Sequence, residues 1–250
     1  MSDGGQLPDP PENREPPGPQ PIFLLPASVT VLAGLLAAIH LASTLVLNAE
    51  GQAQLAFWFG FIPLRAIIAD QFEGGWLPLL WTPVTHAFLH AGWEHLLVNT
   101  AWLVIFATPV TRRYGAVPML VIFLLSAVVG ALAFAATTLP ELQVLIGASG
   151  GVAGLTGAAV RFMFQPVVFG RDPITGEVRP LGRRLASLRD LLREKRARIF
   201  TLIWVLLNAA IPLLPMITGE SVGIAWQAHL GGFFTGLLIV SLFEKRGEDA

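Results

Sequence analysis

Four polar residues are unusual because each lies within or at the start of a long apolar segment. Ser149 opens an apolar run that ends at Phe164, His229 is the only ionisable residue of a second run, and His95 and Asn99 begin a third. Strongly polar groups in hydrocarbon are costly and usually functional. A serine, a histidine and further hydrogen-bond donors are the groups that acyl transfer requires. The residues therefore predict a hydrolase with its active site inside the bilayer.

Ser149 is the predicted nucleophile and His229 the predicted general base. A serine hydroxyl becomes reactive only beside a base, and His229 is the only histidine among the last 150 residues. At about 100° per residue, His229 shares one helix face with Gly232 and Gly236. Small faces let membrane helices approach closely, which would bring His229 within hydrogen-bond reach of Ser149. The same glycines could also serve packing alone.

The oxyanion formed in acyl transfer needs preorganised donors. Ser149 lies at a predicted helix N-terminus, where backbone amides are free, and His95 and Asn99 are four residues apart on one helix face. We therefore predict the Ser149 amide, His95 and Asn99 as oxyanion donors. The alternative is that His95 and Asn99 join helices or anchor at the interface. The last three predicted spans contain no acidic residue, which favours a Ser–His dyad.

Three histidines close in sequence raise the alternative of a metal site. His86 and His90 are spaced as two ligands on one helix could be. However, a His-Glu-x-x-His motif is absent, His95 lies about 140° from His90 around a helix, and no carboxylate is an evident third ligand. We predict no metal and no cofactor, and we interpret His40 as a packed polar residue.

The composition is that of a membrane protein. Hydrophobic residues make up 54% of the 250 residues and charged residues only 13%, with a mean hydropathy of +0.64. A soluble domain has about twice this charged fraction. The absence of cysteine excludes disulfides and cysteine nucleophiles. Residues 1–21 are polar and rich in proline without a basic segment followed by an apolar core, which predicts a disordered tail rather than a secretory signal.

Six apolar segments are each near the length that spans a bilayer as a helix, so we predict an all-α membrane protein. They cover residues 25–47, 95–111, 117–138, 148–165, 199–217 and 222–243. The segment between the first two is long and aromatic. Its Trp76, Trp81 and Trp93 predict an interfacial first loop, as in the aromatic belts of membrane proteins.

Lysine and arginine lie almost entirely on one predicted side of the membrane. Arg112 and Arg113 follow the second span, nine basic residues lie in the connection 166–198, and the opposite side has only Arg65. This asymmetry predicts cytoplasmic N- and C-termini. It also puts Ser149 and His229 in the outer leaflet, since spans two, four and six then all run inward.

Four leucines in the basic connection have helical spacing. They are Leu181, Leu185, Leu188 and Leu192, with charged residues between them. The pattern predicts a short amphipathic helix on the cytoplasmic membrane surface. A solvated helix that only enforces topology is the alternative.

Three motifs, in this order, resemble those of the rhomboid intramembrane serine proteases. The resemblance covers residues 25 to 243 and rests on His90-x4-His95-x3-Asn99, Gly147-x-Ser149-Gly150 and Ala228-His229-x2-Gly232-x3-Gly236. It implies a six-span rhomboid bundle. It also implies that Ser149 is the nucleophile, that His229 is the base, and that His95, Asn99 and the Ser149 backbone hold the oxyanion.

The resemblance further implies that His90 has a structural part in the loop above the site, and that Gly147, Gly150, Gly232 and Gly236 are structural residues near it. Its substrate would be another membrane protein, cut near the outer end of a transmembrane helix. The fifth span, which ends in Pro-Leu-Leu-Pro, matches the helix that gates lateral entry in the family.

The chain departs from the family pattern at three positions. Thr82 replaces a frequent arginine after Trp81, Ala153 replaces a frequent aromatic residue that packs on the histidine, and Thr111 replaces a frequent acid before the basic pair after the second span. The second change implies a looser orientation of His229. A non-cleaving rhomboid-like protein that binds membrane helices is the alternative function. A transporter would have charged groups or broken helices at mid-membrane. The polar groups of this chain are instead predicted in the outer leaflet, which disfavours that function.

The expected organisation is a tail over residues 1–21 and a protease domain over residues 22–245, with the basic cytoplasmic loop at 166–198. We expect an integral multi-pass protein of a bacterial inner (plasma) membrane. Its expected partners are transmembrane-helix substrates and membrane lipid, with no nucleic acid. The sequence does not indicate an oligomeric state.

Overall fold

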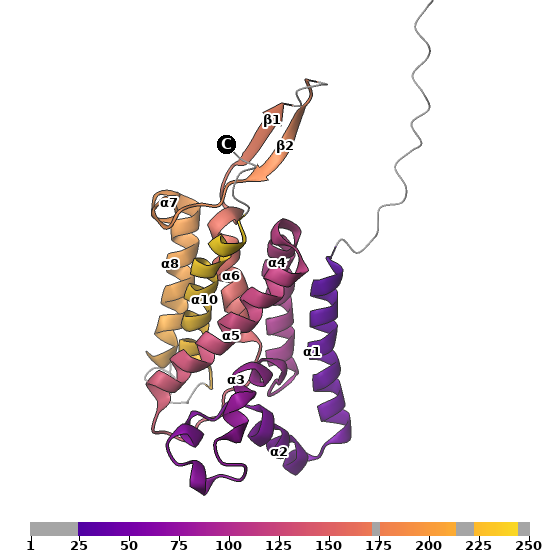
Figure 1. Cartoon of the computed structure of the whole chain (residues 1–250), viewed down its shortest axis with the longest axis vertical. Coiled ribbons are helices and arrows are strands. Elements are labelled where there is room, and N and C mark those ends of the chain that lie inside the picture. Colours follow the sequence, from indigo (N-terminus) through magenta and orange to yellow (C-terminus); the bar gives the residue numbers. More distant parts are fainter. Residues whose placement is uncertain (1–24, 172–175, 214–222, 245–250) are drawn as a thin grey trace, which may run out of the picture.

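A computed structural model describes residues 25–171, 176–213 and 223–244. The predicted tail at 1–21 therefore lies outside the described residues. Long helices form a bundle (Figure 1). They are α1 (Ala27–Val46), α4 (Trp93–Tyr114), α5 (Ala116–Thr138), α6 (Ser149–Met163), α8 (Lys195–Ala210) and α10 (Trp226–Ile239).

Each of these helices corresponds to one predicted span, but they differ in their fitness to cross a bilayer alone. Four stretches among the described residues are long and apolar enough to do so: Ala27–Val46, Ala116–Thr138, Lys195–Leu213 and Trp226–Phe243. The α6 helix has only 15 residues, and α4 carries polar groups at both ends, from Glu94 and His95 to Arg112 and Arg113. The chain thus has four candidate membrane spans within a mostly helical fold.

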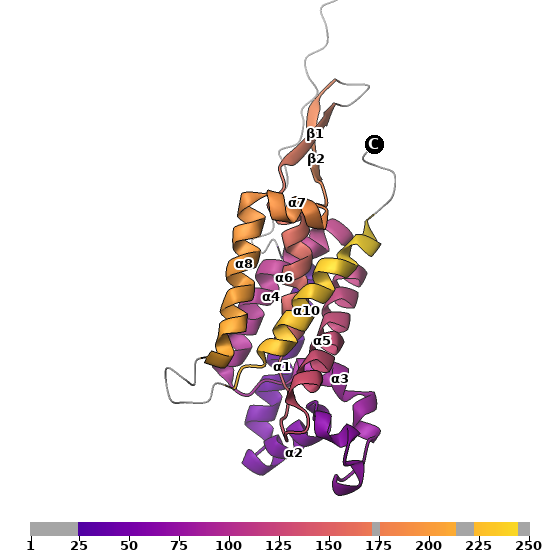
Figure 2. The same cartoon turned by 90° about the vertical axis from the view of Figure 1, so that its left-hand side faces the viewer.

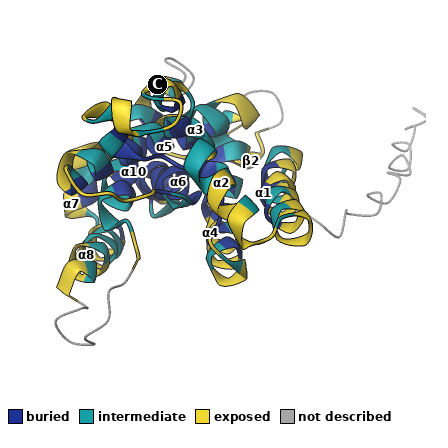
Figure 3. Cartoon of the chain, turned by 90° about the horizontal axis from the view of Figure 1, so that it is seen from below, coloured by how far each residue is buried: buried dark blue, intermediate teal, exposed yellow. Residues whose placement is uncertain are grey.

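The short α6 helix is the centre of the bundle. Every residue from Gly150 to Phe162 is buried, and Figure 3 shows α6 in dark blue between α10 and α4. Glycines make this packing possible, because a Cβ at Gly232 would lie 2.0 Å from the Gly150 carbonyl oxygen, and one at Gly236 would lie 1.8 Å from the Gly154 carbonyl oxygen. The backbones of α6 and α10 therefore touch, as small residues allow.

The first loop is folded rather than extended, and Figure 1 shows it at one end of the bundle, which we call the loop end. It contains α2 (Ala49–Phe59), α3 (Thr82–Thr85) and short 3-10 turns at Pro63–Ala66, Ala69–Gln71, Leu77–Leu80 and His86–Phe88.

Arg65 organises this loop from within. Its side chain is fully buried and donates to the carbonyl oxygens of Glu73 (2.8 Å), Gly75 (3.1 Å) and Phe57 (3.2 Å). The guanidinium also lies 4.2 Å from the Phe57 ring centroid, a cation–π distance. A guanidinium with its five donors can join three carbonyl oxygens from two backbone segments in this way.

The opposite end of the bundle, the hairpin end, contains a feature that the sequence did not predict. A two-stranded antiparallel hairpin, β1 (Val167–Arg171) and β2 (Val178–Arg183), extends beyond the helices (Figures 1 and 2). The fold is mostly helical, and this hairpin is an addition that the predicted all-α bundle did not include. The predicted amphipathic helix is wrong at Leu181, which lies in β2, and the helix that does form, α7 (Leu188–Arg193), has six residues.

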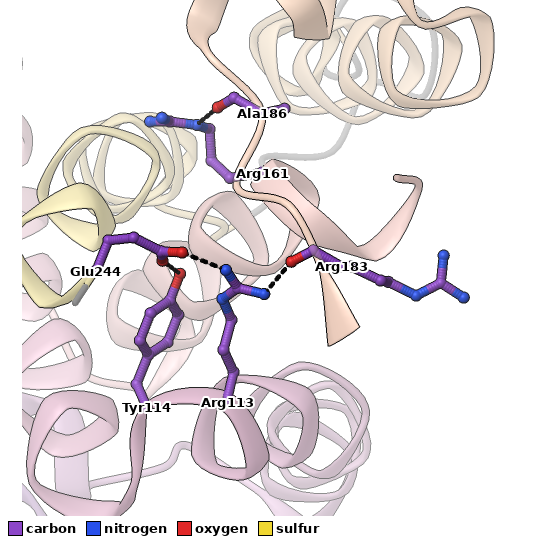
Figure 4. A network of polar contacts seen from close by, with 6 residues as sticks. All are labelled: Arg113, Tyr114, Arg161, Arg183, Ala186 and Glu244. Atoms are coloured by element: carbon purple, nitrogen blue, oxygen red, sulfur yellow. Dashed lines mark hydrogen bonds and ion pairs between the residues drawn. The ribbon is translucent and has the colours of Figure 1, made fainter. Parts of the chain in front are cut away.

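A polar network closes the hairpin end (Figure 4). Glu244 accepts hydrogen bonds from Arg113 and from Tyr114 (2.7 Å), which ties the end of α10 to the end of α4. The buried Arg161 of α6 donates to the carbonyl oxygens of Ala186 (2.6 Å) and Leu237 (2.8 Å). These bonds fix the ends of α4, α6 and α10 against one another.

Candidate active site

A cavity of about 360 Å³ lies between α4, α6, α8 and α10. Ser149 and His229 both line it, from α6 and α10, and Asn99 lines it from α4. The remaining wall is mostly apolar and comprises Val98, Trp102, Val152, Ala153, Thr156, Phe200, Ile203, Trp204, Leu207 and Asn208. The cavity thus brings together a hydroxyl, an imidazole and an amide from three helices.

Ser149 is the first residue of α6, and the chain that leads into it is tightly constrained. Gly147 has a φ of +124°, and a Cβ there would lie 2.7 Å from the His95 ring. The Gly147 amide donates to the His86 carbonyl oxygen at 2.9 Å. The α6 helix has no side-chain cap, so the first-turn amides beside Ser149 have no partner within the helix.

Asn99 and His95 lie against this same turn. Asn99 is buried, and its Nδ2 has no hydrogen-bond partner among the described residues. This nitrogen lies next to Gly147, 3.7 Å from the position that a Cβ would take there. A buried amide donor without a partner costs free energy, so its place in the cavity wall indicates a position for an acceptor. The His95 ring packs on Gly147 but is not part of the cavity wall.

His90 lies behind the serine turn. Its Nε2 accepts from the Ala148 amide at 3.5 Å, and its ring meets the His95 ring edge-on at 5.1 Å. His40 is buried nearby, edge-on to Trp93 at 4.7 Å. Among the described residues no three histidine or acidic side chains form a group suited to a metal ion. His90 therefore supports the backbone next to Ser149 rather than facing the cavity.

His229 has a partner that the sequence did not predict. Its Nδ1 lies 2.8 Å from Asn208 Oδ1, and Asn208 Nδ2 donates to the Trp204 carbonyl oxygen at 2.8 Å. Asn208 belongs to α8, and both residues line the cavity. The signal in the sequence is an uncharged amide inside an apolar span, and this amide lies outside the three motifs.

Ser149 and His229 share the cavity without a direct contact. No hydrogen bond joins their side chains in the described part of the chain, an arrangement common in enzymes without substrate. Ala153, one turn after Ser149, is buried and also lines the cavity. A methyl group there fills less of the cavity than an aromatic ring would.

The cavity opens to the side between α4 and α8. Four of its lining residues are substantially exposed: Val98 (57%), Trp102 (40%), Ile203 (53%) and Leu207 (67%). Two of them lie on α4 and two on α8, so these helices frame the mouth. Figure 3 shows α8 at the edge of the bundle, apart from the central helices.

Comparison with known proteins agrees with the motifs. A family model described as "Rhomboid domain" matches residues 78–246. The chain is similar to "Putative rhomboid protease YdcA" of Bacillus subtilis (strain 168), with 35% identity over 170 residues that cover 66% of this chain and 70% of that protein.

More distant relatives are longer. "Rhomboid-like protease 3" of Toxoplasma gondii is 28% identical over 170 residues, 68% of this chain and 54% of that protein. "RHOMBOID-like protein 6, mitochondrial" of Arabidopsis thaliana is 24% identical over 160 residues, 64% of this chain and 42% of that protein. The chain thus spans about half the length of these two relatives.

Proposed function

Since the chain belongs to the rhomboid family, we propose that it is an intramembrane serine endopeptidase that uses Ser149 as nucleophile and His229 as general base. The observation that carries this proposal is the shared cavity. Ser149, His229 and the unpartnered amide of Asn99 line it together from three helices. These are the three kinds of group that serine-dependent acyl transfer requires.

In the proposed reaction, His229 Nε2 takes the proton of Ser149 Oγ as that oxygen attacks a peptide carbonyl carbon. Negative charge then develops on the carbonyl oxygen. We propose that Asn99 Nδ2 and the free amides at the start of α6 donate to it. His95, which packs on Gly147 outside the cavity wall, would be a further donor only if its ring turned toward the cavity. His229 returns its proton to the leaving amine. Water then hydrolyses the acyl-serine, with His229 again as base.

The proposed substrates are transmembrane helices of other proteins. A mouth between α4 and α8 framed by exposed apolar residues suits a substrate that arrives from lipid rather than from water. Backbone in a helix is already hydrogen-bonded, so the segment to be cut must unwind to reach Ser149. The start of α6 lies at the loop end, which favours cleavage near one end of the substrate helix.

We also propose that all six long helices cross the membrane. The loop end would face outward, both termini and the basic connection 166–198 would be cytoplasmic, and residues 22–245 would form one protease domain. The support is the basic hairpin end, with Arg112 and Arg113 on α4, opposite a loop whose one arginine is buried.

Cleavage in liposomes tests this proposal. The purified protein would be reconstituted with single-span reporter proteins, and the fragments analysed by mass spectrometry. We expect a cut near one end of the reporter span by the wild type and none by Ser149→Ala. Reporters that bind without being cut by a well-folded wild type would instead show a non-cleaving rhomboid-like protein.

A further inference from the structure

We propose that Asn208 is a positioning residue that holds His229 in the tautomer needed for base catalysis, and that it makes this function depend on the position of α8. The inference rests on the proposed function of Ser149 and His229. It adds a third member to the predicted dyad, contributed by the helix that frames the cavity mouth.

The hydrogen bonds fix the direction of donation. The Trp204 carbonyl oxygen can only accept, so the Asn208 group 2.8 Å from it must be the amide NH₂. The Asn208 oxygen then faces His229 Nδ1 at 2.8 Å. This oxygen can only accept, so Nδ1 must carry the ring proton. Nε2 is thereby left with the lone pair that a general base needs.

Asn208 also orients the His229 ring, which no other hydrogen bond or aromatic neighbour is shown to do among the described residues. It provides the only hydrogen bond to the His229 ring in the part of the chain that the structure describes. Ala153, which lines the same cavity, has a methyl group at the position where the rhomboid pattern often has an aromatic ring. A neutral amide suits this place, because a carboxylate buried among apolar residues carries a large desolvation cost. The same division of roles occurs in Cys-His-Asn proteases.

The position of α8 then affects the base directly. Ala197 is the only buried residue of α8, while Leu206 and Leu207 are 63% and 67% exposed. The main aromatic contact of α8 with α10 near the site is the stack of Trp204 on Phe233, with ring centroids 4.4 Å apart. An outward movement of α8 that widened the mouth would carry Asn208 away from His229. The hydrogen bond between Asn208 and His229 would therefore re-form only when α8 moves back against α10.

The pH dependence of labelling by a fluorophosphonate probe tests the positioning role. We expect Asn208→Ala to label more slowly, by on the order of 10²-fold, since general-base catalysis contributes about 10² to 10⁴. Asn208→Asp should move the midpoint of the acidic limb to higher pH, because a carboxylate beside Nδ1 stabilises the protonated ring. A merely structural role would lower the rate without moving that midpoint.

Leu206→Ala, on the exposed face of α8, is the matched control and should label at the wild-type rate. An Asn208→Ala protein that labels as fast as wild type overturns the inference, and so does an unmoved midpoint in Asn208→Asp. If the aspartate variant does not fold, the rate of Asn208→Ala decides. A wild type that does not label refutes the proposed function itself, and the inference with it.

A double-mutant cycle tests the dependence on α8. Trp204→Ala removes the stack on Phe233 and should slow labelling in the wild-type background. In the Asn208→Ala background the same change should have little further effect, because the link from α8 to the base is already gone. Additive losses in the two backgrounds would overturn the coupling.

Discussion

At the scale of single residues, the orphaned amide of Asn99 is the most direct sign of chemistry. Its Nδ2 is buried without a partner in the described part of the chain, beside the turn that leads into Ser149. Buried donors in stable proteins are nearly always satisfied. In the proposed reaction, this unsatisfied donor at the cavity wall would be preorganised for a charge that exists only during catalysis.

Asn99→Ala should therefore lower kcat by about 10²-fold with little change in KM, because loss of an oxyanion donor acts on the transition state. The remaining donors, His95 and the amides at the start of α6, limit the loss. Steady-state cleavage of a reporter in liposomes measures it, with Thr137→Val, an exposed position on α5, as control. An unchanged kcat would remove Asn99 from the oxyanion site.

The sequence predicted the residues of the site better than their connections. Ser149, His229 and Asn99 were found because polar groups are rare in apolar segments, and the structure brings all three to one cavity. Asn208 was missed because its role depends on a contact 21 residues away in sequence. No pattern within one helix reveals which face of α8 meets α10.

At the scale of elements, the contact between α6 and α10 determines whether Ser149 and His229 can meet. The two helices approach until carbonyl oxygens of one touch the glycines of the other, at Gly232 and Gly236. Backbone atoms cannot rotate aside as side chains can, so any added Cβ must separate the helices. Separation at this contact would also increase the distance between His229 on α10 and Ser149 on α6.

Gly236→Ala should destabilise the protein by about 1–3 kcal/mol and slow probe labelling. The added Cβ would lie 1.8 Å from the Gly154 carbonyl oxygen. Gly34→Ala is the matched control, because a Cβ at Gly34 of α1 has no neighbour within 4 Å. Thermal unfolding in detergent compares them, and equal midpoints for the two variants would contradict the proposed close contact.

The first loop contains a buried histidine that makes its stability depend on pH. His86 is 1% exposed, its Nδ1 hydrogen-bonds the Thr82 carbonyl oxygen at 3.0 Å, and its own carbonyl oxygen holds Gly147. Burial lowers the pKa of His86 to about 4. The unfolded chain, with a His pKa of about 6.5, therefore binds more protons between these two values.

The contribution of buried, neutral His86 to the free energy of unfolding is fully present above about pH 6.5 and decreases as pH falls toward 4. The loss at pH 5 is about 2 kcal/mol by linkage. Unfolding midpoints measured from pH 7.5 to 4.5 should fall less steeply in His86→Gln, which keeps a donor to Thr82 but does not titrate. Parallel curves for the two proteins would show that His86 does not control the acid sensitivity.

The helices were predictable and the hairpin was not. Long apolar segments have few alternatives to a helix in lipid, so each predicted span overlaps a helix of the structure. The leucine spacing from Leu181 to Leu192 is also satisfied by chance across β2, a connecting segment and α7. Short windows cannot distinguish these cases, because the hairpin depends on pairing between Val167 and Arg183.

At the scale of the whole molecule, the two ends of the bundle differ in chemistry. The loop end has exposed aromatic residues such as Trp76, with Arg65 buried inside it. The hairpin end has the basic residues of the connection, including Arg184 and Arg193, and the network around Arg113. This asymmetry fits the proposed orientation across a membrane, with the candidate site nearer the loop end.

Single-cysteine labelling measures this orientation, and the chain has no cysteine to interfere. Gln71→Cys in the loop should react with an impermeant maleimide in intact cells. Leu192→Cys in α7, where the native side chain is 69% exposed, should react only after permeabilisation. The reverse pattern would invert the proposed topology and place both termini outside.

Labelling of the purified protein with a fluorophosphonate probe reports whether Ser149 is a serine activated by His229, as we propose. The wild type should label, while Ser149→Ala and His229→Ala should both fail to label although they remain folded in detergent and in liposomes. A folded wild type that stays unlabelled in liposomes, or a His229→Ala protein that labels normally, would contradict the account.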